Sequence, residues 1–153
     1  MKKIITLILA LALVFGVVSC ASSSSSVSQD KINKAFSDVY QKYRNDIIMD
    51  GYTIHEVQPG DTLTQIAKDR YGSDNGYYFP LIMLASSEVI LDPDLIQPGM
   101  ELKIPDLQRN KNNARAAKAM KNYFYEIADV YKYKKTAEAK KTREGIIKLA
   151  NAL

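Results

Sequence analysis

Few residues of this chain could perform acid–base or nucleophilic chemistry. His55 is the only histidine and Cys20 the only cysteine, and together they fall short of the ligand set of a structural zinc site. Asp92 and Asp94 form a carboxylate pair of the kind that glycoside hydrolases use, but Pro93 between them is typical of a loop. No glycine-rich phosphate-binding sequence is present. We therefore expect a non-catalytic protein that uses no metal or other cofactor.

The first nineteen residues have the pattern of a secretory signal peptide. Lys2 and Lys3 precede an apolar run from Ile4 to Val18, and Ser19 follows it. A spanning helix needs about 20 apolar residues, and this run is several short of that length. We predict that residues 1–19 are removed on export, and an uncleaved anchor is the alternative.

The end of this run, Val17-Val18-Ser19-Cys20, resembles the lipobox of bacterial lipoproteins. The resemblance implies that Cys20 carries a thioether-linked diacylglycerol, becomes the new N-terminus and holds the protein on a lipid bilayer. The expected location is therefore the cell envelope, on the periplasmic or cell-surface side of a membrane. An ordinary secreted protein with a coincidental cysteine is the alternative, although a free thiol would be a liability in an oxidising compartment.

Two segments flank the middle of the chain, one before it and one after it. Residues 20–30 are rich in serine and cannot offset the entropy of ordering, so they predict a flexible tether. Residues 31–50 then carry apolar side chains at steps of three and four, the spacing of an amphipathic helix. These side chains are Ile32, Phe36, Val39, Tyr40, Tyr43 and Ile47. We expect the stripe to pack on the same chain, and a binding surface for an envelope protein is the alternative.

The middle of the chain predicts the order strand, helix, helix, strand. A short strand at 55–58 leads into a helix that starts with a capping box of Thr62 and Gln65. A second helix begins near Pro80, since proline suits the first helical position. Pro98 and Gly99 suit the centre of a type II turn. The alternating residues 101–104 then form the second strand.

These elements carry a resemblance to the lysin motif, LysM, over residues 52–106. The matching stretches are Val57-Gln58-Pro59-Gly60-Asp61-Thr62-Leu63, Ile66-Ala67, Tyr71-Gly72 and the run from Asp92 to Pro105. The resemblance implies an α+β module in which two antiparallel strands carry two helices on one face. It also implies non-catalytic binding of glycans that contain N-acetylglucosamine, such as peptidoglycan.

By the same resemblance, the glycan lies in a shallow groove between two loops. The expected contacts are Gly60, Asp61, Thr62 and Leu63 in the first loop and Asp92, Asp94, Leu95 and Ile96 in the second. Each also has a structural alternative: Thr62 as a helix cap, Asp61 as a turn residue, and Leu63 and Ile96 as core. The chain departs from the family at Thr64, where an aromatic is frequent, and at Phe79 and Ser86, where tryptophan and asparagine are usual.

The tail, residues 109–153, again has helical spacing, and a break near 134–136 divides it into two helices. Its lysines suit a solvated helix face, with contact to an anionic surface as the alternative. These are Lys132, Lys134, Lys135, Lys140, Lys141 and Lys148. Interleaved glutamates and the export signal argue against nucleic acid, and the formal charge of +4 falls to about +2 once the signal is removed.

Together these features predict a membrane-tethered lipoprotein that binds peptidoglycan through one LysM domain. Two alternatives stay open. One is a cation-binding sensor that uses Asp92 and Asp94 as oxygen ligands. The other is an envelope scaffold whose flanking helices bind a protein partner.

Overall fold

The computed structural model describes residues 27–153, so the signal segment, Cys20 and most of the tether lie outside the described residues. The helices are α1 (Gln29–Tyr43), α2 (Leu63–Tyr71), α3 (Phe79–Ala85), α4 (Leu107–Asn112), α5 (Ala114–Val130) and α6 (Ala137–Ala152). The strands are β1 (Thr53–Glu56) and β2 (Glu101–Ile104), and short 3-10 turns span η1 (Gly76–Tyr78), η2 (Pro93–Leu95) and η3 (Tyr131–Tyr133).

The middle of the chain is an α+β unit of strand, helix, helix and strand, which confirms the predicted fold class. β1 and β2 pair antiparallel, with Thr53 opposite Ile104 and Glu56 opposite Glu101. The first strand lies two residues earlier than the predicted 55–58. Gln97 accepts a hydrogen bond from the Met100 N–H (3.2 Å), and Gly99 has a φ of 88°. This confirms the type II turn, whose third residue needs a positive φ.

The start of α2 follows only half of the predicted capping box. Thr62 Oγ1 accepts a hydrogen bond from the Gln65 N–H (3.2 Å), but the Gln65 side chain donates to Asp69 (2.7 Å) instead of returning to Thr62. Asp69 lies one helical turn further on, where an i, i+4 partner is in reach, and it competes for the amide. The prediction that the Gln65 side chain bonds back to Thr62 was therefore wrong.

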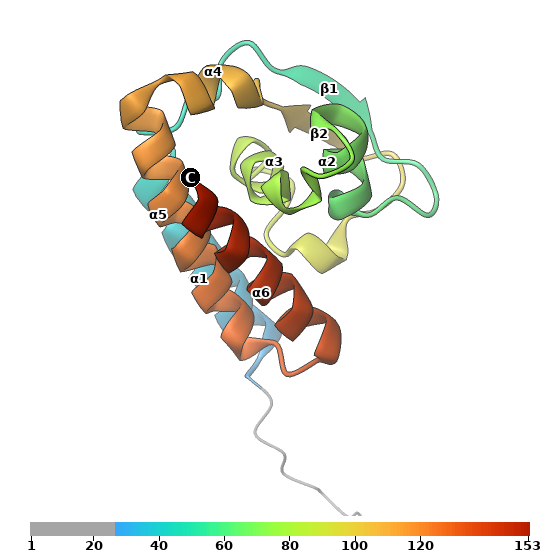
Figure 1. Ribbon diagram of the computed structural model, residues 1–153. Coiled ribbons are helices and arrows are strands. Elements are labelled where there is room, and N and C mark those ends of the chain that lie inside the picture. The colour runs from blue at the N-terminus through green and yellow to red at the C-terminus, as the bar shows by residue number, and fades with distance from the viewer. Residues whose placement is uncertain (1–26) are drawn as a thin grey trace, which may run out of the picture.

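Helix α3 lies between the sheet and the flanking helices (Figure 1). All seven of its residues are buried, as expected for a helix that is apolar on every side. Pro80 stands in its first turn, which confirms the predicted start. Just after the helix, the buried Ser86 hydroxyl accepts a hydrogen bond from the Lys103 N–H (2.8 Å) and so ties α3 to β2.

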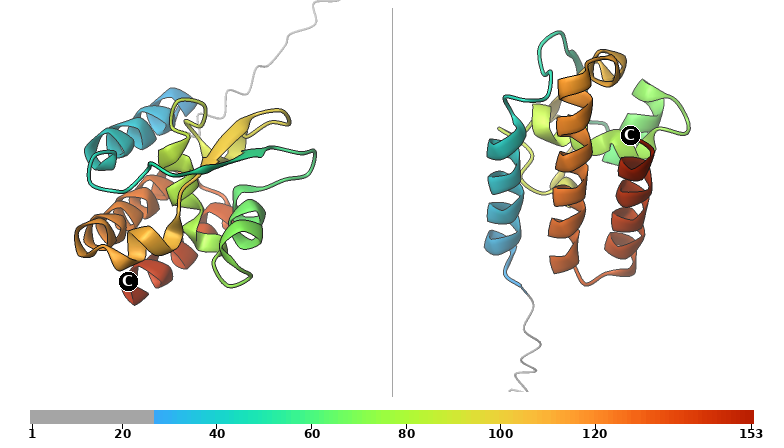
Figure 2. Two further views of the ribbon diagram at one scale, coloured as in Figure 1. Left: turned by 90° about the horizontal axis from the view of Figure 1, so that it is seen from above. Right: turned by 60° about the vertical axis from the view of Figure 1, so that its left-hand side comes forward.

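Helices α1, α5 and α6 lie side by side and run in alternating directions, as the right-hand view of Figure 2 shows. They cover the α3 side of the LysM unit, and the buried Tyr123 hydroxyl of α5 donates to the Pro80 carbonyl (2.7 Å). The apolar stripes of the two flanks thus meet each other and the LysM unit, as predicted. Within residues 27–153, no helix is long and apolar enough to cross a membrane.

The flanking helices differ from the sequence in their bounds. α1 begins at Gln29 and ends at Tyr43, so the last predicted tether residues are helical and residues 44–50, predicted as helix, are not helical. Buried Asn110 explains this irregular stretch, since its side chain pairs with both the N–H and the carbonyl of Ile48 (2.9 Å each). The tail breaks at 134–136 as predicted, and Thr136 caps α6 through the Ala139 N–H (3.0 Å).

Candidate glycan-binding site

Both predicted groove loops open onto one cavity of ≈ 320 Å³. The first loop contributes Asp61, Thr62, Leu63 and Thr64, and the second contributes Pro93, Asp94 and Ile96. Phe79, Tyr131 and Thr142 complete the lining. Five of the eight predicted contacts therefore line one hollow, while Gly60, Asp92 and Leu95 do not.

The first loop is held by contacts inside the LysM unit. Asp61 accepts hydrogen bonds from the Gln58 N–H (2.9 Å) and from His55 Nε2 (2.8 Å). The Arg70 guanidinium can only donate, and it donates to His55 Nδ1 (3.1 Å), so the hydrogen of the ring sits on Nε2. The Gln58 N–H, and then His55, lower the pKa of Asp61 from its ordinary value.

The first loop thus shows the structural roles that the sequence left open as alternatives. Thr62 caps α2, Asp61 closes the turn, and Leu63 belongs to the core. Gly60 forms the turn with a φ of 93°, a value that favours glycine. Asp61, Thr62 and Leu63 nevertheless line the cavity. A ligand would therefore meet side chains that the turn, the helix cap and the core already hold in place.

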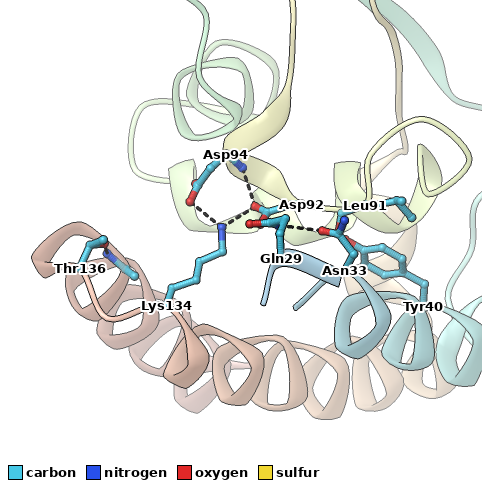
Figure 3. A network of polar contacts seen from close by, with 9 residues as sticks. Gln29, Asn33, Tyr40, Leu91, Asp92, Asp94, Lys134 and Thr136 are labelled. Carbon is cyan, nitrogen blue, oxygen red and sulfur yellow. Dashed lines mark hydrogen bonds and ion pairs between the residues drawn. The ribbon is translucent and has the colours of Figure 1, made fainter. Parts of the chain in front are cut away.

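The second loop is held by residues outside the LysM unit (Figure 3). Asp92 is only 2% exposed, and its carboxylate accepts from the Asp94 N–H (2.9 Å), from Gln29 Nε2 of α1 (2.7 Å) and from Lys134 Nζ. Its oxygens are fully engaged within the protein. A buried carboxylate needs such partners, so Asp92 has a structural role in this loop, and its predicted contact with glycan stays a prediction.

Lys134 lies between the carboxylates of the second loop (Figure 3). Its side chain is 9% exposed and pairs with both Asp92 and Asp94 (2.5 Å to Asp94). The ammonium also lies over the rings of Phe36 (5.9 Å) and Tyr131 (5.8 Å), where cation–π attraction adds to the ion pairs. Lys134 is thus not part of the predicted solvated face.

The position of Lys134 also bears on the cation-sensor alternative. Its ammonium occupies the place between Asp92 and Asp94 that a metal cation would take. Nowhere in residues 27–153 do three or more histidine, cysteine, aspartate or glutamate side chains gather as candidate metal ligands. The structure therefore gives the cation alternative no support.

The rest of the second loop is accessible. The Asp94 side chain is 66% exposed and has one carboxylate oxygen outside its ion pair. Leu95 is 51% exposed next to it, and Ile96 is half-buried against the core. A charged oxygen beside two apolar side chains suits a sugar, which presents hydroxyls at its edge and C–H groups on its faces.

Tyr131 and Thr142 were missed as site residues because they come from the far end of the chain. Helical spacing placed Tyr131 in an apolar stripe, but no pattern could reveal that this stripe borders the LysM loops. Burial, and then the charges of Asp94 and Asp92, raise the pKa of Tyr131 well above its usual value. The phenol therefore stays protonated and can act as a donor.

A second hollow of ≈ 380 Å³ lies at the opposite end of the sheet, beside Arg70, Tyr71 and Asp106. It contains none of the predicted contacts and lies away from both signature loops. Burial, and then Asp106, raise the pKa of Tyr71, so this phenol is neutral as well. The cavity between the loops remains the candidate site because both blocks of the motif converge there.

Comparisons with known proteins identify the middle of the chain. Residues 55–105 match the LysM domain family. An uncharacterized protein of Deinococcus radiodurans is 44% identical over 55 residues, which are 36% of this chain and 20% of that protein. The chain thus spans about a fifth of the length of this relative. No solved structure matches the chain significantly.

LysM is a binding domain rather than a catalytic one and supports recognition of peptidoglycan or a related glycan. The chain therefore contains a LysM domain at residues 55–105, a third of its length.

Proposed function

We propose that this protein is a lipoprotein, tethered to a membrane through Cys20, that binds peptidoglycan through the cavity between its two LysM loops. The observation that carries the proposal is the convergence of both signature loops on that cavity. The exposed Asp94 and Leu95 offer a hydrogen-bonding group and an apolar surface side by side.

Binding by one such module is weak. Association costs several kcal/mol before any contact stabilises the complex, so a small cavity gives a Kd between about 1 μM and 1 mM. A tether that keeps the domain near the cell wall raises its effective concentration, so a weak site is still largely occupied.

A pull-down on purified sacculi tests the glycan site. The full mature chain should co-sediment, and Thr62→Lys should abolish co-sedimentation, because it places a long charged side chain at the lining of the cavity. Val89→Lys is the control for the added charge, since Val89 is exposed but does not line the cavity. Equal binding by wild type and Thr62→Lys would remove the cavity from the proposal.

The tether is tested separately by mass spectrometry of the protein from the membrane fraction. The mature chain should begin at a diacylated Cys20, and Cys20→Ala should appear in the soluble fraction. Support for this part comes from the lipobox-like sequence alone. An intact Met1, or an unmodified Cys20 in the membrane fraction, would contradict it.

A further inference from the structure

The cavity between the LysM loops has a third wall that comes from the C-terminal helices. Tyr131 of η3 and Thr142 of α6 line it together with the two loops. Buried Phe79 forms the floor and meets Tyr131 edge-on, with ring centroids 6.5 Å apart. A strand–helix–helix–strand unit alone contributes two loops, so this wall is a property of the flanks.

The third wall is fixed in place at three points. Lys134 pairs with Asp92 and Asp94 immediately before α6, and Thr136 caps the helix. Further along, Gly145 lies so close to the Tyr77 ring that a Cβ there would overlap it. The wall therefore belongs to the resting shape of the cavity and needs no closure on binding.

Tyr131 has an unused polar atom at this wall. Only 3% of Tyr131 is exposed, and the residue lines the cavity. Its hydroxyl has no hydrogen-bond partner among the described residues. It is not among the fully buried polar atoms without a partner in the described chain, which are Tyr71 Oη and Arg143 Nε. Tyr131 thus brings an unpaired phenol to the lining of the cavity. An unpaired buried donor is costly unless water or a ligand satisfies it.

The size and shape of the hollow limit what can enter. At ≈ 320 Å³ the cavity lies at the lower end of the range for ligand pockets, which suits one or two sugar rings. A glycan strand in a groove with two walls continues past both ends. A strand that meets a helix across one end of the groove must stop there.

We propose that α6 and η3 convert the LysM groove into a half-closed pocket that takes the terminal sugar of a glycan chain, with Tyr131 Oη and Thr142 touching that sugar. This inference rests on the proposed glycan-binding function and specifies its substrate as chain ends rather than chain interiors. Tyr131 and Thr142 are then contact residues that the two LysM loops alone would not supply.

Titration of the full mature chain with N-acetylglucosamine oligosaccharides, from the disaccharide to the hexasaccharide, tests the inference by calorimetry. An end-binding pocket has one register on each chain, so the Kd should stay constant with length. Internal binding gives a hexasaccharide several overlapping registers and a Kd roughly fivefold lower than that of the disaccharide. Reduction modifies the reducing end and 4-O-methylation the non-reducing end, so one of these two changes should abolish binding and the other should leave it unchanged.

Two variants test the third wall directly. Thr142→Trp should fill the cavity and abolish oligosaccharide binding, while Lys141→Trp, on the exposed side of α6, should bind like wild type. Tyr131→Phe keeps the volume and removes only the hydroxyl, so it should raise the Kd about threefold to tenfold without unfolding the protein. It also keeps the wall testable if Thr142→Trp does not fold.

The outcomes separate the two proposals. If wild type bound neither oligosaccharides nor sacculi, the proposed function would fail, and the inference with it. If wild type bound glycan, but with a Kd that falls with length and is indifferent to end blocking and to Tyr131→Phe, only the inference would be overturned. A constant Kd that is lost on end blocking and raised by Tyr131→Phe would establish it.

Discussion

The two loops of the candidate site are held in different ways. The first loop is closed by His55 and Thr62, both inside the LysM domain. The second is closed by Gln29 of α1 and Lys134 before α6, both outside it. One half of the site is thus a property of the module, and the other half depends on the helices around it. A module of this kind can acquire new binding properties through its flanks while its signature residues stay the same.

Lys134→Met should give the largest effect, because it removes the only cation that contacts the buried Asp92 carboxylate in the described residues. Loss of one partner of a buried ion pair costs about 3–5 kcal/mol. Urea unfolding should show that loss, and hydrogen exchange should rise in the second loop before the first. Lys135→Met is the control, since Lys135 is exposed. If the double variant with Asp92→Asn recovered none of the loss, the ion pair would not be its source.

Gly145→Ala should come next, because the added methyl would overlap the Tyr77 ring and push α6 away from the LysM unit. Overpacking costs about 1–3 kcal/mol, partly offset by the better helix propensity of alanine, up to about 1 kcal/mol. Thermal unfolding measures the net loss, with Glu144→Ala as the exposed neighbour on the same helix. The cost should shrink in a Tyr77→Ser background, and an unchanged cost there would contradict the overlap.

Thr62→Ala and Thr136→Ala form a matched pair that sharpens the comparison. Each removes a hydroxyl that accepts from a backbone N–H three residues on, and each should cost about 1 kcal/mol of stability. Hydrogen exchange should locate the first loss in α2 and the first loop, and the second in α6 and the third wall. The same pattern of exchange in both variants would mean that the two halves of the site are one cooperative unit.

The smallest effect is expected on the stability of the protein at acidic pH. The pKa of Asp61 is lowered in the folded protein, so its stabilising contribution is present above its ordinary pKa and lost as the pH falls through the lowered value. Carboxyl NMR titration should give a midpoint below the ordinary value of 3.8. Since Gln58 has the largest effect and His55 the next, His55→Leu, which has no donor, should raise the midpoint only in part. A midpoint indifferent to that substitution would exclude the His55 bond.

Much of this fold was predictable, because its elements follow local rules. The turn at Gly99, the start of α3 at Pro80 and the cap of Thr62 are each set by residues within a few positions. The predictions failed where another residue offered a partner that the local pattern does not show. Asp69 accepts a hydrogen bond from the Gln65 amide, and Asn110 pairs with the backbone of Ile48. Lys134 looked like its solvated neighbours, since no local pattern distinguishes a lysine that meets Asp92 forty-two positions away.

The hydrogen bond from Gln29 to Asp92 joins the first residue of α1 to the loop that borders the cavity. If the chain is anchored through its N-terminus and holds the wall through this cavity, tension between membrane and wall enters the fold at one side of the site and leaves at the other. The route is short and bypasses the sheet and α2. The protein would then lose the Gln29 contact first, while Lys134 still holds Asp92 and Asp94 and the LysM core stays folded.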